Sequence, residues 1–181
     1  MSFVQDTIFG SSVVKRLTDM DKIMLLDAEK LVSCVELDPG DRNNFLEYVQ
    51  KNLHLHEYRT GRRLSLAAAS AWIRRALAEA LRSRNPYRVN LLLGGMDKEQ
   101  PSLYYLDYLA SCNPVDYAAQ GYCGYFAPAV LDRHWKPGLN EKEGIELMHT
   151  VIDQIKTRLV ISQNRFVIKI ISAQGVQVMY Y

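Results

Sequence analysis

The stretch that most restricts the possible folds of this chain is Arg82–Ala110, near the middle of the sequence. Apolar residues alternate with other residues from Val89 onward and stop at Gly94-Gly95, and a second extended pattern runs over Leu103–Leu109. The polar turn Met96–Ser102 separates the two runs, so this stretch predicts a β-hairpin. Because the first strand is apolar at almost every position, we expect both of its faces to be covered by other layers.

Shorter strands precede this hairpin. The runs Lys22–Leu26 and Leu31–Leu37 are joined by the turn Asp27-Ala28-Glu29, an arrangement that predicts another hairpin. Ser12–Leu17 predicts one more short strand, whereas residues 1–11 carry only a weak pattern. The chain is therefore expected to begin with strands.

Two amphipathic helices are predicted between these strands and the central hairpin. The first begins at Asp41, whose carboxylate can cap the free N–H groups of the first turn, and it ends near Thr60-Gly61. The second has Ser65 as its N-cap and stops before Pro86, which forbids continuation. The expected buried stripes are Phe45, Tyr48, Val49 and Leu53 on the first helix and Leu66, Ala69, Ile73, Ala76, Leu77 and Ala80 on the second.

The rest of the chain continues with a strand, two helices and two strands. In order, these are a strand at Val115–Gly121, a short helix at Tyr125–Trp135, a longer helix after Asn140, and strands at Arg165–Ile171 and Val176–Tyr180. Asn140 and Glu143 have the spacing of a capping box, and the Gln174-Gly175 turn predicts a closing hairpin. The stripe expected on the longer helix is Ile145, Met148, Ile152, Ile155 and Leu159.

The order of these segments limits the fold class. Each helix pair and each sheet has an apolar face that needs a partner layer, and a four-layer α-β-β-α sandwich of the α+β class supplies all of them. A doubly wound parallel sheet requires strict alternation of strand and helix, which this order lacks. The length of 181 residues predicts a single domain, residues 1–181.

The composition argues against several classes of protein. With 48% hydrophobic and 23% charged residues, the chain is expected to fold. The formal net charge of +2 is too small for a strong attraction to nucleic acid or anionic membrane, so neither is expected as a partner. No apolar run reaches the length of a membrane span, and Asp6, Lys15 and Asp19 interrupt the region where a signal peptide would have its apolar core.

The histidines do not have the spacing of a metal site. His54 and His56 are two apart on a predicted helix and so point to different faces. His134 and His149 have no paired ligands nearby in the sequence. We therefore expect all of them to be surface or boundary residues.

The three cysteines, Cys34, Cys112 and Cys123, also lack metal-ligand spacing and lie in or beside apolar segments. Buried thiols in a reducing compartment are the expected state. Cys123 stands before a helix N-terminus, where a thiolate is favoured, but the sequence places no base beside it. A packed thiol is therefore the preferred interpretation.

Several short motifs, in the same order along the chain, resemble the β-subunit family of the 20S proteasome, and within it a non-catalytic type. They are FLEYVQKN at 45–52, RSRNPYRVN at 82–90, LYYLDYL at 103–109, AAQGY at 118–122 and LDR at 131–133. The resemblance covers about Ser12 to Val176 and implies the four-layer fold of the N-terminal-nucleophile hydrolase type. Compared with the family pattern, this chain lacks a few residues at its N-terminus and others between Ile8 and Ser12. Val4-Gln5-Asp6 would then be a remnant of the family's first hairpin.

The resemblance further implies partners and a cellular role. Members assemble into a seven-membered β ring, which stacks on the opposite β ring and on an adjacent α ring, in the cytoplasm and nucleus and without a cofactor. A non-catalytic member contributes to assembly and to the wall of the proteolytic chamber in ubiquitin- and ATP-dependent protein degradation.

Active members of the family use an N-terminal threonine freed after a glycine; its own α-amine is the base, and a lysine lowers the pKa of the nucleophile. Lys22 aligns with that lysine, but residue 1 is methionine and no threonine of this chain follows a glycine. Ser11 follows Gly10, yet only 10 residues separate it from Lys22, too few for the intervening hairpin. We therefore predict no catalytic, cofactor-binding or metal-binding residues. Lys22 stands at the position of the family's lysine, but no nucleophile is expected to accompany it.

Two loops also depart from the pattern of active members. Ser162-Gln163-Asn164 stands where they have an aspartate followed by Ser-Gly-Gly, and Glu36-Leu37-Asp38-Pro39 replaces the glycine-bearing loop of the oxyanion site. Two alternatives stay open. One is an active N-terminal threonine or serine peptidase whose true start is missing from this sequence; the other is a free-standing binding module on the same fold, for instance for RNA.

Basic residues along the two central helices allow two interpretations. One is a nucleic-acid patch; the other is a solvated helix surface on which some arginines pair with acidic groups of a neighbouring subunit. Near-neutral net charge and the lack of interleaved exposed aromatic residues favour the second. The residues concerned are Arg62, Arg63, Arg74, Arg75, Arg82 and Arg84.

Overall fold

The computed structural model describes residues 4–9, 12–17, 21–36, 40–97, 100–159, 165–172 and 174–181. For 4–9 and 12–17 the description is of the backbone. The chain forms two compact units, and each is described by itself. One comprises 22–116 and 169–178, and the other comprises the residues up to Asp21, 117–168 and 179–181.

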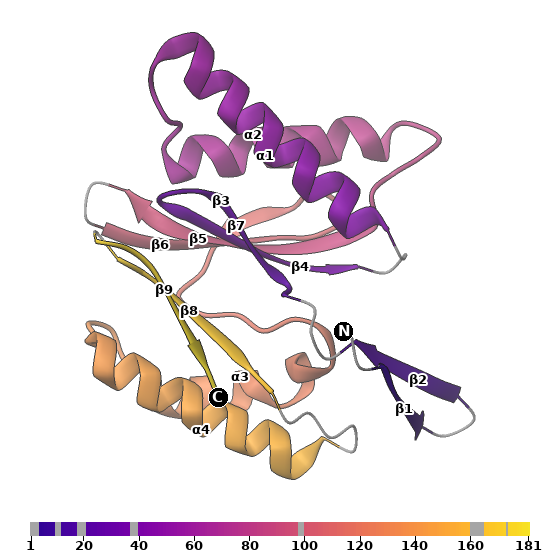
Figure 1. Cartoon of the computed structure of the whole chain (residues 1–181), viewed down its shortest axis with the longest axis vertical. Helices are drawn as coiled ribbons and strands as arrows, with labels where there is room; N and C mark the ends of the chain where they lie inside the picture. The colour runs from indigo at the N-terminus through magenta and orange to yellow at the C-terminus, as the bar shows by residue number, and fades with distance from the viewer. Residues whose placement is uncertain are drawn as a thin grey trace. The chain divides into compact units, whose positions relative to one another are not determined.

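A five-stranded antiparallel sheet is the centre of the unit that contains 22–116 (Figure 1). In spatial order its strands are β3 (Ile23–Asp27), β4 (Lys30–Glu36), β5 (Val89–Asp97), β6 (Gln100–Leu106) and β7 (Cys112–Pro114). Cys34 of β4 lies opposite Leu91 of β5, which lies opposite Leu106 of β6. The two hairpins predicted from the sequence therefore share one sheet.

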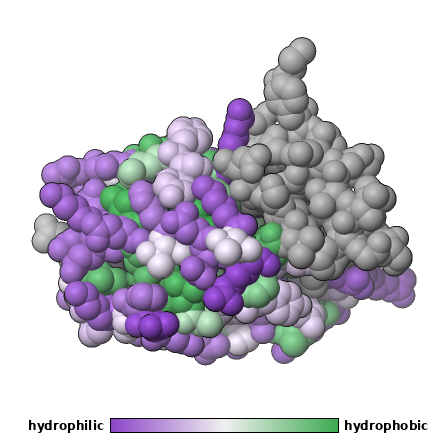
Figure 2. All heavy atoms as spheres, turned by 90° about the horizontal axis from the view of Figure 1, so that it is seen from below, coloured by the Kyte–Doolittle hydropathy of each residue, from purple (hydrophilic) through white to green (hydrophobic). Residues whose placement is uncertain are grey.

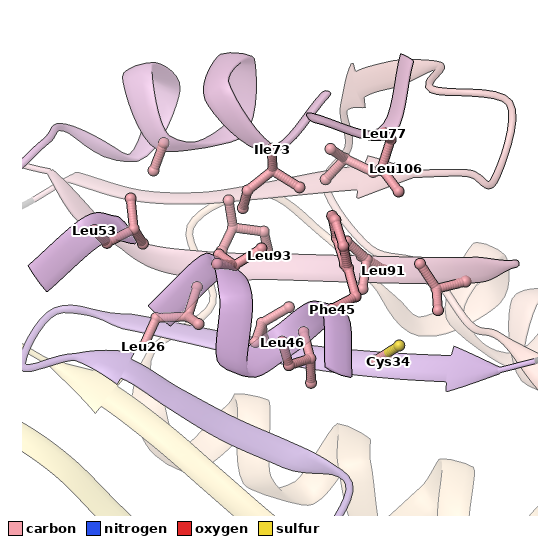
Figure 3. Close-up of a cluster of buried hydrophobic side chains, with 14 of the residues drawn as sticks. Leu26, Cys34, Phe45, Leu46, Leu53, Ile73, Leu77, Leu91, Leu93 and Leu106 are labelled. Carbon is pink, nitrogen blue, oxygen red and sulfur yellow. The ribbon is translucent and has the colours of Figure 1, made fainter. Parts of the chain in front are cut away.

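Two helices, α1 (Asp41–Thr60) and α2 (Leu66–Leu81), cover one face of this sheet (Figure 1). Their apolar side chains meet those of the strands in one continuous core (Figure 3). Its fully buried members include Leu26, Phe45, Val49, Leu66, Ile73, Leu77, Leu91, Leu93 and Leu106. Burial of each such side chain contributes about 1.5–3 kcal/mol to folding, so this core supplies much of the stability of the unit.

The strand β5 is covered unequally on its two faces. Val89, Leu91 and Leu93 are fully buried, whereas Asn90 and Leu92 between them are only partly buried. The alternation means that one face packs under the helices and the other keeps some exposure. Both faces were expected to be covered by other layers; in the single chain the face with Asn90 and Leu92 is covered only in part.

The start of α1 differs from the prediction. Its N-cap is Gly40, in the left-handed conformation at φ 97°, and Asp41 is the first helical residue. The Oδ2 atom of Asp41 accepts the backbone N–H of Arg88 at 3.0 Å. Asp41 therefore fastens α1 to the segment that enters β5, a contact between residues distant in sequence.

The predicted stripe of α1 is right except at Tyr48. Phe45, Val49 and Leu53 are buried, but Tyr48 is 46% exposed. Its ring lies 5.7 Å from the ring of Trp72 on α2. A tyrosine at the margin of a stripe can pack its ring on a neighbour while its hydroxyl stays in water.

The sequence correctly predicts α2 and its cap. Ser65 Oγ accepts the N–H of Ala68 at 3.2 Å, which satisfies one of the open donors of the first turn. Leu66, Ala69, Ile73 and Leu77 are buried, as predicted. Ala76 and Ala80, at the margins of the stripe, are partly buried.

The central hairpin is longer and tighter than the sequence predicts. β5 continues through Gly94-Gly95 to Asp97, which pairs with Gln100, so the expected turn Met96–Ser102 is much shorter. A Cβ on Gly95 would lie 2.6 Å from the carbonyl oxygen of Glu29. The glycine therefore permits a close backbone approach inside the sheet and does not end the strand.

The strand predicted at Val115–Gly121 is wrong. β7 ends at Pro114, which has no N–H to donate to a ladder, and the residues that follow form no strand. Instead, the ring of Tyr117 lies 5.5 Å from that of Trp135, and its hydroxyl donates to the carboxylate of Asp132. Side-chain contacts with the next helix thus hold this segment.

The other unit contains η1 (Gly121–Tyr125), α3 (Ala127–His134) and α4 (Glu141–Arg158). The predicted short helix Tyr125–Trp135 thus begins slightly later, after a 3-10 turn. The capping box is confirmed: Asn140 Oδ1 accepts the N–H of Glu143 at 3.0 Å, and Glu143 Oε2 accepts the N–H of Asn140 at 2.9 Å.

The buried face of α4 matches the predicted stripe only in part. Ile152 and Ile155 are buried as predicted, but Val151 is buried as well, and Leu147 packs against the cluster that contains Val151 and Ile155. Met148, predicted to be buried, is 40% exposed. Leu147, Val151 and Ile155, spaced four residues apart, form the packed face of the helix. Met148 therefore lies at the margin of this face.

Two hairpins complete the described chain. Their strands are β1 (Val4–Phe9), β2 (Ser12–Leu17), β8 (Val167–Ser172) and β9 (Gly175–Tyr180). The pairing of β1 with β2 places a strand within residues 1–11, where the sequence pattern is weak. The pairing of β8 with β9 confirms the closing hairpin, and reciprocal backbone hydrogen bonds of 2.9 Å between Phe166 and Tyr181 fasten its open end.

The strand β3 lies at one edge of the five-stranded sheet. Gln50 Nε2 of α1 donates to the carbonyl oxygen of Leu25 at 2.8 Å, and Lys169 Nζ of β8 donates to the carbonyl oxygen of Ile23. Side chains therefore occupy two backbone acceptors of this edge strand.

Candidate functional site

Lys22, the residue that the motif resemblance places at the position of the lysine of active members, is exposed and stands immediately before β3. Several groups relevant to catalysis fall outside the residues that the structure describes. These are Met1, Ser11, Leu37-Asp38-Pro39 and Ser162-Gln163-Asn164. The prediction that Lys22 has no accompanying nucleophile therefore stays a prediction.

The threonines of the helices are bonded to their own backbone. Each threonine hydroxyl donates a hydrogen bond to the backbone carbonyl four residues earlier. The pairs are Thr60 with His56 at 2.8 Å, Thr150 with Glu146 at 3.0 Å and Thr157 with Asp153 at 2.8 Å. Each hydroxyl thus satisfies a carbonyl of the preceding turn. These contacts suit a helix surface, and none involves a general base.

The histidines are dispersed over the two units. His54 and His56 are partly buried on α1, and His134 is exposed at the end of α3. His149 on α4 stacks on Tyr181, with ring centroids 4.4 Å apart. Across the described ranges, no three His, Cys, Asp or Glu side chains gather as metal ligands.

The cysteines were expected to be buried thiols; Cys34 is buried, whereas Cys112 and Cys123 are only partly buried. Cys34 is buried in the larger core, and Cys123 packs against the smaller cluster around α3 and α4. Burial raises the pKa of the Cys112 thiol above its ordinary value of 9.0, although a hydrogen bond with Ser70 and the charge of Arg74 act in the opposite direction. Such a thiol is a weak nucleophile at neutral pH.

Two of the arginines pair with glutamates of the same chain. Arg63 Nε lies 2.9 Å from Glu57 Oε1, and Arg75 Nε lies 2.8 Å from Glu79 Oε1. Exposed pairs of this kind contribute little stability, but they neutralise positive charge locally. The two helices therefore do not present a continuous basic track.

A buried ion pair, which no pattern in the sequence predicts, lies at the β3–β4 turn. Lys30 Nζ is 3.0 Å from Asp27 Oδ2, and the two side chains are 1% and 8% exposed. The N–H of Glu29 also donates to Asp27, at 2.9 Å to Oδ1. A buried charge needs such partners, so this pair fixes the turn.

A polar hollow of about 490 Å³ lies where the segment after α2 meets the start of α1. It is lined by Asp41, Arg84, Asn85, Pro86, Tyr87 and Arg88. The sequence singled out Arg84 as one of a basic set and Asp41 as a helix cap. It could not place them together, because they lie on different elements.

The surface carries separate exposed aromatic and apolar residues. Tyr58 is 86% exposed, Tyr125 is 81% exposed and Leu109 is 56% exposed. Figure 2 shows one face on which hydrophilic residues alternate with groups of hydrophobic ones. Amphipathic rings of this kind are common where proteins meet other proteins.

Residues 5–171 match the model of the family described as "Proteasome subunit". The chain therefore belongs to the proteasome subunit family. The resemblance inferred from the short motifs is confirmed, as is the α+β fold of the N-terminal-nucleophile hydrolase type. A member of this family works as one subunit of a multi-subunit particle.

Named relatives align with almost the whole chain. "Proteasome subunit beta type-2-B" of Arabidopsis thaliana is 47% identical over 171 residues, which cover 94% of this chain and 85% of the relative. "Proteasome subunit beta type-2" of Oryza sativa is 41% identical, covering 94% and 80%. The protein of that name from Dictyostelium discoideum is 39% identical, covering 96% and 88%.

None of the helices in the described ranges combines the length and the apolar character that crossing a membrane requires.

Proposed function

We propose that this chain is a non-catalytic β-type subunit of the 20S proteasome core, corresponding to the beta type-2 subunits of its relatives. The observation that carries the proposal is the alignment of nearly the full chain with proteins of that name, at up to 47% identity. Residues 1–181 act as a single domain of the particle.

Its role is structural. It takes one position in a seven-membered β ring, which stacks on the opposite β ring and on an adjacent α ring in the cytoplasm and nucleus. It contributes to assembly and to the wall of the proteolytic chamber, and it needs no cofactor. Exposed tyrosines such as Tyr58 and Tyr125 suit a chain that contacts several neighbours.

The absence of catalysis is supported by the residues that would have to act together. Lys22 stands at the position that the motif resemblance assigns to the lysine of active members, but no threonine of this sequence follows a glycine. The hydroxyls of Thr60, Thr150 and Thr157 are engaged with helix carbonyls. A lysine alone cannot attack a peptide bond at an appreciable rate without a positioned nucleophile.

The test is native isolation of the endogenous particle, followed by treatment with an electrophilic peptide that modifies N-terminal threonine. We expect the chain to copurify with other proteasome subunits at fixed stoichiometry and to remain unmodified while active subunits are labelled. Labelling of this chain would establish an active peptidase. A small free species that retains RNA would establish a binding module and refute the ring assignment.

A further inference from the structure

The polar hollow beside the start of α1 is formed by a rigid segment. Ser83 Oγ donates to the carbonyl of Ala80 at 2.7 Å and accepts the N–H of Asn85 at 3.1 Å, which closes the end of α2. At the other end, the N–H of Arg88 is held by Asp41 at 3.0 Å. The segment is therefore fastened on both sides of the hollow.

An aromatic contact anchors the middle of the segment to the core. The ring of Tyr87 lies 4.7 Å from that of Phe45, which is fully buried. Pro86, next to it, has a fixed φ angle, which further reduces the freedom of the backbone. A site ordered in this way loses little conformational entropy when a ligand group enters.

Arg84 brings a positive charge to the hollow. Arg88 and the carboxylate of Asp41 also line it, and one oxygen of this carboxylate accepts the backbone N–H of Arg88. Arg84 is exposed and makes no ion pair with any described residue. In this respect Arg84 differs from Arg63 and Arg75, whose charges are met by glutamates of the same chain.

We propose that this hollow receives an acidic side chain, an aspartate or glutamate, from another subunit of the proteasome. A guanidinium offers parallel N–H donors that match the two oxygens of a carboxylate, and the Asn85 amide can add another donor. Pro86 and Tyr87 provide an apolar wall for the stem of the incoming side chain. The proposal rests on the proposed function, because it takes its partner from the assembled particle.

A protein carboxylate suits the hollow better than a nucleic-acid phosphate. Binding along a phosphate chain needs several basic groups in a row, whereas the residues that line this hollow include two arginines and one carboxylate. The formal net charge of the chain is only +2. The chemistry therefore fits one acidic group presented at a defined point.

The first experiment locates the occupant in the assembled particle. A photoreactive amino acid replaces Asn85 in the full chain, the particle is isolated and irradiated, and the cross-linked peptides are identified by mass spectrometry. We expect a peptide of another proteasome subunit with an aspartate or glutamate at the linked position or beside it. A link to nucleic acid, a link to a peptide without acidic residues, or no link would overturn the proposal.

The second experiment tests the charge. Arg84→Glu and the control Arg62→Glu, on the exposed turn between α1 and α2, each compete with the unaltered chain for incorporation into the particle. We expect Arg84→Glu to lower incorporation about tenfold, the loss associated with one charge-assisted hydrogen bond, and Arg62→Glu to change it less than about twofold. Equal incorporation of the two variants would refute the proposal.

Two further measurements separate the possible failures. Thermal unfolding of the isolated variants should give equal midpoints, so that loss of incorporation is not loss of folding. Arg84→Glu should regain incorporation when the cross-linked acidic residue of the partner is changed to arginine, and a lack of rescue would contradict direct pairing. If the unaltered chain enters the particle while the hollow stays empty, this inference fails and the proposed function stands; if the chain does not enter, both fail.

Discussion

The carbonyl oxygen of Glu29 occupies the space into which a side chain on Gly95 would project. A Cβ at Gly95 would lie 2.6 Å from that oxygen and 3.0 Å from Leu66 Cδ1. The Glu29 oxygen is held in place because it also accepts the N–H of Met96 at 3.1 Å. The strands β4 and β5 can therefore approach in this way only with glycine at position 95.

Gly95→Ala should lower the free energy of unfolding by about 1–3 kcal/mol, since the added methyl group forces the backbone or Leu66 to move. Chemical denaturation followed by circular dichroism measures the change. Gly144→Ala is the matched control, because a Cβ there has open space in α4. It should leave stability equal or raise it by about 0.5–1 kcal/mol. A Gly95→Ala chain as stable as the unaltered one would show that the close approach is not restrictive.

The buried pair of Asp27 and Lys30 should be costly to break from one side. Asp27→Ala leaves the Lys30 ammonium buried without its partner, so the free energy of unfolding should fall by about 3–5 kcal/mol. The double change Asp27→Ala with Lys30→Met should recover most of this loss, because no unpaired charge remains. The exposed pair of Lys51 and Glu47 is the control, and Lys51→Ala should change stability by less than about 1 kcal/mol. Similar losses from both pairs would contradict the role of burial.

The capping box of α4 should make stability depend on pH. A hydrogen bond from the Asn140 N–H, and next the contact with Lys136, lower the pKa of Glu143 below its usual 4.5. A lowered pKa in the folded chain means that the stabilisation is complete above the unfolded value and is lost as the pH falls through the folded value. The difference in melting temperature between the unaltered chain and Glu143→Gln should therefore be largest near neutral pH and should narrow below pH 4.5. A constant difference over this range would refute the assignment.

The thiol of Cys112 should react slowly at neutral pH. Burial raises its pKa, and Ser70 partly offsets the rise through a hydrogen bond. Ser70→Ala should therefore raise the pKa further and slow alkylation at a given pH, provided that the fold is kept. The measurement is the rate of iodoacetamide labelling of the Cys112 peptide against pH, by mass spectrometry. Faster labelling in the Ser70→Ala chain, at unchanged stability, would show that Ser70 protects the thiol by a different mechanism.

Lys22 should be dispensable for peptide hydrolysis by the assembled particle. Lys22→Ala changes an exposed side chain at the entry to β3, so activity against each class of peptide substrate should stay within about twofold of the unaltered particle. Particle yield, measured in parallel, controls for assembly. Selective loss of one peptidase activity at normal yield would show that Lys22 belongs to a working active site.

The parts of the structure that could be predicted depend on local signals. Ser65 and the pair of Asn140 and Glu143 act within a single helical turn, so their spacing in the sequence is enough to identify them. The alternation of Val89, Leu91 and Leu93 likewise follows directly from strand geometry. The two central hairpins and the order of elements could therefore be derived before any coordinates.

The parts that could not be predicted depend on partners far away in sequence. The role of Asp41 is set by Arg88, 47 residues later, and the role of Gly95 is set by the backbone of Glu29 in the β3–β4 turn. Met148 is exposed because a slightly different side of α4 packs against the neighbouring helix. The apolar stripe in the sequence predicts the packed side only to within about one residue. The hollow around Arg84 likewise brings together residues of different elements, so it could be found only in three dimensions.

The side chains of Gln50 and Lys169, by engaging the carbonyl oxygens of Leu25 and Ile23, also protect the chain before it meets its partners. A bare outer strand can recruit a strand from another polypeptide, including a second copy of the same chain. With those acceptors engaged, newly made copies have less tendency to polymerise through this border. Assembly of the particle then depends on surfaces where side chains make the contacts, and such contacts can distinguish the correct neighbour from other chains.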